Sequence, residues 1–145
     1  MTVDVQIAEL DGAPAPPAAS EIARWAEAAR GDDTRSLCLR VVGEAEGAAL
    51  NTRFRDRRRA TNVLAFPAEQ PGVLGDIAIC APVAALEARQ QDKVLADHYA
   101  HLVVHGVLHL LGLDHDTPRK AAAMEAREIR LLGRFGIVDP YGDQT

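Results

Sequence analysis

Residues 105–115 read HGVLHLLGLDH, and three of these residues are histidines. His105 and His109 are four residues apart, a spacing that places two side chains on one face of an α-helix. Gly112 can end that helix and turn the chain back, which would bring His115 close to the first two rings. Three imidazoles around an open fourth position are typical of a catalytic zinc site. We therefore expect one zinc ion per chain, bound by His105, His109 and His115 at the end of a helix.

Two further histidines precede this stretch. His101 lies one helical turn before His105, so it can be a fourth ligand or a neighbouring buried side chain that supports the ligands. We expect His98 to lie at the surface.

The residue after the first histidine is unusual for a zinc hydrolase. Metzincin peptidases have a glutamate there, which acts as the base, whereas this chain has Gly106. Glycine inside a helix costs about 1 kcal/mol relative to alanine, so Gly106 indicates either a packing need or space beside the metal. Because zinc itself lowers the pKa of bound water towards ~7, hydroxide can form without that base. The pattern favours a phosphodiester over an amide as the substrate.

Charge is distributed unevenly along the chain. The 145 residues carry a net charge of −5, yet residues 53–59, RFRDRRR, hold five arginines and one aspartate. This segment has a local charge of +4, so the rest of the chain carries −9. A cationic patch on an acidic protein predicts a defined anionic partner, although a solvated helix end is an equal alternative.

Hydrophobic periodicity predicts one mixed domain over residues 1–145. Strands are expected at residues 3–10, 36–43, 61–66 and 75–81, and helices at 21–30, 44–56, 82–90, 92–111 and 119–133. Thr117 and Pro118 are typical of a helix start, and Gly133 of a helix end. The expected fold is α+β, a roughly four-stranded mixed sheet packed with helices, with the zinc site at the end of a central helix.

The sequence also favours the cytoplasm. The first ten residues show no signal peptide, and the apolar stretch from Leu102 to Leu113 is too short to cross a bilayer. Cys38 and Cys80 lie in apolar strand-like segments, where free buried thiols are expected.

Several motifs together resemble one protein family. HGVLHLLGLDH resembles the H-G-x-L-H-x-x-G-x-D-H signature of the YbeY family of bacterial endoribonucleases and rRNA maturation factors. LNTRFR, TNVLAFP and LGDIAI resemble further blocks of that family in the same order, so the resemblance covers essentially the whole chain. Two departures stand out. Ala65 replaces a usual serine, and Arg58 stands where an acidic residue is common.

The resemblance implies a function and its residues. It implies a zinc-dependent, single-strand-specific endoribonuclease that acts in 16S rRNA 3′-end maturation and ribosome quality control. Ribosomal RNA would be the substrate, and small-subunit ribosomal proteins and an assembly GTPase would be partners. His105, His109 and His115 match the family's zinc ligands, and Arg55 matches an arginine needed for RNA processing.

Physical chemistry suggests a part for each charged residue. Arg55 would stabilise charge on phosphate oxygens as a bidentate guanidinium. Flanking phosphates would be held by Arg53, Arg57, Arg58 and Arg59. Asp114 would orient an imidazole or accept a proton, and Asp76 would support the site or have a structural role at a strand start.

Two alternatives stay open at this point. A non-catalytic ribosome-assembly factor would use zinc structurally and the arginine patch for docking RNA or protein. A zinc peptidase with an unusual base is the other alternative, and Gly106 argues against it.

Overall fold

Four strands form one mixed sheet at the centre of the molecule. The computed structural model describes residues 3–10, 12, 14–55 and 62–141, and among them the sheet order is β1-β2-β4-β3. The strands are β1 (Val3–Ile7), β2 (Ser36–Val42), β3 (Val63–Pro67) and β4 (Val73–Cys80). β1, β2 and β4 are mutually parallel, and β3 pairs with β4 in the antiparallel direction. The expected four-stranded mixed sheet is confirmed.

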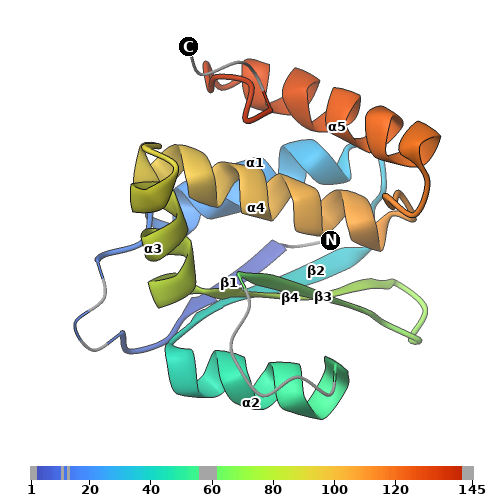
Figure 1. The fold of residues 1–145 in the computed structure, drawn as a ribbon. Coiled ribbons are helices and arrows are strands. Elements are labelled where there is room, and N and C mark those ends of the chain that lie inside the picture. The colour runs from blue at the N-terminus through green and yellow to red at the C-terminus, as the bar shows by residue number, and fades with distance from the viewer. Residues whose placement is uncertain (1–2, 11, 13, 56–61, 142–145) are drawn as a thin grey trace.

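The helices cover the sheet unequally. They are α1 (Ala19–Arg30), α2 (Glu44–Arg55), α3 (Ala81–Gln90), α4 (Leu95–Leu110) and α5 (Pro118–Gly133). In Figure 1, α1 and α4 lie over one face of the sheet, α5 lies on the outside of α4, and α2 lies alone on the opposite face. Parallel strands need crossover connections, and α1 supplies the one between β1 and β2. The α+β class is confirmed.

The main core lies between the sheet and the pair α1 and α4. Ile22 and Trp25 of α1 are buried in this core. Val103 and Leu108 of α4 are buried in the same cluster. His101, His105 and His109 share one face of α4, and most of the other residues of this helix are apolar and buried. A helix that is apolar on nearly every side belongs inside a protein, so α4 is the central helix that the sequence predicts.

Local sequence signals determine where α4 ends and where α5 begins. At the end of α4, the Gly112 N–H donates to the His109 carbonyl oxygen at 3.0 Å, and the Leu113 N–H donates to that of Leu108 at 3.1 Å. This is a Schellman motif, and the φ of +101° at Gly112 is one that glycine readily adopts. At the start of α5, the Thr117 side chain accepts the Lys120 N–H at 3.2 Å. Both predicted helix ends are confirmed.

Some boundaries differ from expectation. α4 begins at Leu95 and not near residue 92, because α3 ends in a turn that includes Asp92 at a φ of +55°. Cys80 is buried and Cys38 half-buried, and both are free thiols as expected. Burial raises the pKa of both thiols. Within the described part of the chain, no helix is both long enough and apolar enough to span a membrane.

Candidate metal centre

The polar face of α4 carries three histidines at one-turn intervals. His101 and His105 retain 16% and 29% of their side-chain exposure, and His109 is half-buried. After the Schellman turn, His115 is exposed, and its ring centroid lies 5.8 Å from that of His105. Zinc–nitrogen bonds of about 2.0–2.1 Å place two coordinated imidazole rings roughly 5–6 Å apart. The spacing of these two rings therefore fits a shared zinc ion.

A carboxylate from another helix contacts the same histidines. Glu128 of α5 is fully buried, and its Oε2 atom lies 3.0 Å from Nδ1 of His105 and 3.1 Å from Nε2 of His101. Donor atoms of His101, His105 and Glu128 all lie within 4.8 Å of one another, so this cluster could hold a metal ion. Burial acts to raise the pKa of Glu128, but hydrogen bonds from His101 and His105 outweigh it and lower the pKa to about 2.

Tyr141 completes this cluster from the end of the described chain. Its hydroxyl donates to Oε1 of Glu128 at 2.8 Å and lies 3.0 Å from Nε2 of His101. Burial and the neighbouring carboxylate raise the pKa of Tyr141 well above its usual value, so it is a neutral hydrogen-bond donor. Neither Glu128 nor Tyr141 is among the site residues predicted from the sequence. A signal existed for Glu128, an acid at a buried position of α5 in register with Met124 and Leu132.

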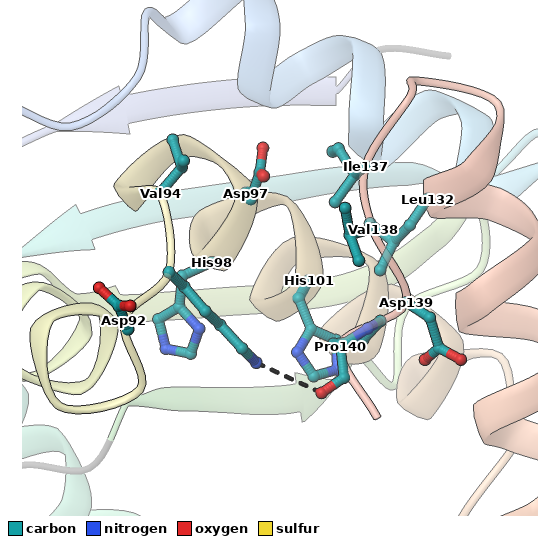
Figure 2. A pocket seen from close by; sticks show the side chains of 11 residues that line it. Asp92, Val94, Asp97, His98, His101, Leu132, Ile137, Val138, Asp139 and Pro140 are labelled. Carbon is teal, nitrogen blue, oxygen red and sulfur yellow. Dashed lines mark hydrogen bonds between the residues drawn. The ribbon is translucent and has the colours of Figure 1, made fainter. Parts of the chain in front are cut away.

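A cavity of about 200 Å³ lies beside this histidine face (Figure 2). Its wall combines the start of α4, including His101, with residues 137–140, which follow α5. The Lys93 ammonium donates to the Pro140 carbonyl oxygen at 3.5 Å, the dashed contact in the figure. The segment after α5 therefore returns to α4, and this path brings the Tyr141 hydroxyl to His101.

His98 does not lie at the surface, so that expectation is wrong. Its side chain is 4% exposed, and its Nε2 atom lies 2.9 Å from Oε1 of Glu87 in α3. The Asn62 amide also donates to both oxygens of Glu87, at 3.1 and 3.2 Å. His98 is buried because α3 packs against the first turn of α4, a contact between helices that helical periodicity does not reveal.

Gly106 meets a packing need and does not make space beside the metal. A Cβ atom built at this position would lie 3.1 Å from Cδ1 and 3.3 Å from Cγ2 of Ile77 in β4. Gly106 therefore faces the sheet, and a glutamate side chain here would be driven into the core. The position that supplies the base in metzincins is closed by packing.

Asp114 lies in the turn between the last two histidines. Its Oδ1 accepts the Asp116 N–H at 3.2 Å, and its Oδ2 lies 3.8 Å from the Lys120 ammonium. These contacts stabilise the turn that presents His115. Asp76 is exposed and neighbours Ile77 in β4, so alternation along the strand points it away from α4, towards a groove beside α2.

The predicted arginine patch lies largely outside the described residues. Arg53 and Arg55 belong to the last turn of α2, and the structure describes their backbone. Arg57, Arg58 and Arg59 lie outside the described residues. The parts expected for these arginines stay predictions.

The fold and this cluster define an α+β domain with a histidine-rich cluster that could hold a metal ion. A family model described as Endoribonuclease YbeY matches residues 17–136. The chain belongs to the YbeY family, and the resemblance seen in the sequence is confirmed.

Curated relatives and a solved structure agree with this assignment. Proteins named endoribonuclease YbeY from Xanthomonas euvesicatoria pv. vesicatoria and Stenotrophomonas maltophilia (strain K279a) are 48% and 50% identical over 139 residues, which cover 88% of this chain and 86% of each relative. One from Alkalilimnicola ehrlichii is 54% identical over 129 residues, 81% of this chain and 78% of the relative. The solution structure of TM1509 from Thermotoga maritima matches 98% of this chain and 100% of its own, with a TM-score of 0.61. At 22% identity, that likeness shows the fold alone.

Proposed function

We propose that this protein is a zinc-dependent endoribonuclease that cuts single-stranded RNA in 16S rRNA 3′-end maturation and ribosome quality control. Its membership of the YbeY family, whose curated relatives are named endoribonucleases, supports RNA cleavage. One structural observation supports the proposed dependence on a metal ion. Nδ1 of His105 lies within hydrogen-bonding distance of the buried Glu128 carboxylate, and the centroid of the His105 ring lies 5.8 Å from that of the His115 ring.

We assign the zinc ion to His105, His109 and His115. Nδ1 of His105 contacts the Glu128 carboxylate, so Nε2, on the other side of the ring, is the nitrogen that would bind the metal. His115 is exposed and His105 and His109 are partly exposed, so an ion between them would remain accessible to RNA. A bound zinc ion supplies a Lewis acid for a phosphate oxygen and lowers the pKa of a water molecule. An open position beside three protein ligands is what that chemistry requires.

The charged residues of the chain would bind and orient the RNA. Arg55 ends α2, and its guanidinium would stabilise negative charge on the non-bridging phosphate oxygens of the bond that is cut. The other arginines of residues 53–59 would hold neighbouring phosphates, which gives affinity without base selection. Asp114 would keep the turn before His115 in place, because its Oδ1 accepts the Asp116 N–H.

The family resemblance also suggests a biological setting. By the family resemblance, small-subunit ribosomal proteins and an assembly GTPase would be its partners, in the cytoplasm. The chain would act as one domain over residues 1–145.

Two alternatives make different predictions. A non-catalytic assembly factor would bind RNA through the arginine patch and show no metal-dependent cleavage. A zinc peptidase would need a base, and Gly106 faces Ile77 where metzincins carry their glutamate. The peptidase alternative would require peptide turnover that survives loss of the arginines.

The test combines metal content with RNA cleavage. We expect about one zinc per chain in the wild type by elemental analysis, and a strong loss of zinc in folded His115→Ala. Arg55→Ala should keep its zinc and its fold but lose cleavage of a single-stranded RNA by about 100-fold or more. Arg89→Ala, which removes an exposed arginine of α3, is the matched control and should cleave normally.

Either of two results would contradict the proposal. Wild-type protein that takes up no zinc from excess zinc would exclude the metal centre. Zinc-loaded protein with no RNA cleavage, or with equal cleavage in Arg55→Ala, would favour the assembly factor.

A further inference from the structure

A buried carboxylate, that of Glu128, connects the candidate metal centre to other parts of the chain through hydrogen bonds. Glu128 is 0% exposed, and both of its oxygens have partners on other parts of the chain. Oε2 contacts His105 Nδ1 at 3.0 Å and His101 Nε2 at 3.1 Å, and Oε1 accepts the Tyr141 hydroxyl at 2.8 Å. A carboxylate this deeply buried costs free energy unless its partners are well placed, so these contacts hold it in one orientation.

These atoms permit two arrangements. In the first, an ion lies among His101, His105 and Glu128, whose donor atoms are within 4.8 Å of one another. In the second, Glu128 holds His105 from behind, and the ion lies on the other side of the His105 ring. The two arrangements share one histidine but use opposite nitrogens of its ring.

Accessibility favours the second arrangement. An ion bound to Glu128 would lie beside a residue with no exposure and under the Tyr141 hydroxyl, which also contacts His101 at 3.0 Å. Glu128 and the Tyr141 hydroxyl would shield such an ion from a phosphodiester. His105 is 29% exposed and His115 is exposed, so the far side of the His105 ring is where a substrate can approach.

We propose that Glu128 is a positioning residue for the metal centre and that Tyr141 holds Glu128 in place. By accepting the Nδ1–H of His105, Glu128 would fix the tautomer that leaves Nε2 without a proton and facing the metal. Tyr141 comes from the segment after α5, so the end of the described chain contributes to metal affinity without touching the metal. This inference rests on the proposed function, because it concerns the same zinc site.

The test measures zinc affinity by competition with a chromophoric chelator, using whole metal-free protein. We expect Glu128→Gln to weaken zinc binding about 10- to 100-fold, because the amide keeps the size of the carboxyl but loses its charge. Tyr141→Phe should weaken it less, by several-fold. Tyr141 is 45% exposed, so its variant tests the proposal even if Glu128→Gln does not fold. Tyr99→Phe, at a buried tyrosine of α4, is the matched control and should bind zinc as the wild type does.

Cobalt spectra distinguish a supporting residue from a ligand. If Glu128 is a positioning residue, cobalt-loaded Glu128→Gln at saturation should keep the wild-type absorption bands, because the ligands are unchanged. If the cobalt bands change in Glu128→Gln and His115→Ala retains its zinc, the ion lies in the buried cluster. That result would overturn the inference. Zinc affinity within twofold of wild type in Glu128→Gln or Tyr141→Phe would also overturn it, while leaving the proposed function intact. A wild-type protein without zinc would overturn both.

Discussion

Replacing Gly106 by alanine tests whether this glycine exists for packing. The new Cβ atom would lie 3.1 Å from Cδ1 and 3.3 Å from Cγ2 of Ile77, which is 2% exposed and has little room to move. Alanine in place of glycine should stabilise the helix by about 1 kcal/mol. Crowding a packed core costs roughly 1–3 kcal/mol. We therefore expect Gly106→Ala to lower the free energy of unfolding, by up to about 2 kcal/mol.

A second substitution isolates the contact. Ile77→Val removes Cδ1, the atom nearest the new Cβ, and alone should cost about 0.5–1.5 kcal/mol. In the Gly106→Ala background the same truncation relieves the crowding, so it should cost about 1 kcal/mol less. The four proteins of this double-mutant cycle are compared by urea unfolding. Gly133→Ala is the control, since a Cβ there meets nothing within 4 Å and should not destabilise the protein.

Two results would contradict the packing of Gly106 against Ile77. If Gly106→Ala stabilises the protein by about 1 kcal/mol and its effect adds to that of Ile77→Val, the glycine faces open space. If it also loses zinc while remaining folded, the glycine makes room beside the metal. Packing against Ile77 predicts instead that the zinc content of Gly106→Ala equals that of the wild type.

Two further predictions concern α5. Thr117→Ala removes the side-chain oxygen that accepts the Lys120 N–H, so urea unfolding should show a loss of about 1 kcal/mol, and an unchanged midpoint would contradict this cap. The pKa of Glu128 is lowered from 4.5 to about 2, so the stability that its ionised form contributes is fully present above pH 4.5 and is lost as the pH falls towards 2. The difference in unfolding free energy between metal-free wild type and Glu128→Gln should therefore shrink by about 3 kcal/mol across that range, and a constant difference would refute the hydrogen-bonded carboxylate.

Much of the architecture could be predicted from the sequence, because its signals are local. The i, i+4 spacing places His101, His105 and His109 on one face of α4, since helical geometry depends on neighbouring residues only. Gly112 and Thr117 mark helix ends through hydrogen bonds that span three to five residues. The apolar residues around the histidine face identify α4 as a central helix. The family motifs are likewise short blocks that can be recognised in order.

Other features depend on how distant segments pack. Glu128 lies 23 residues after His105 in the sequence, and only the packing of α5 on α4 brings its carboxylate to that ring. Tyr141 reaches His101 across 40 residues, through the segment that returns along α4. His98 is buried because α3 carries Glu87 to it. A sequence determines its helix faces through local backbone geometry, but the partner of each face is decided by tertiary packing, whose contacts leave no fixed spacing in the chain.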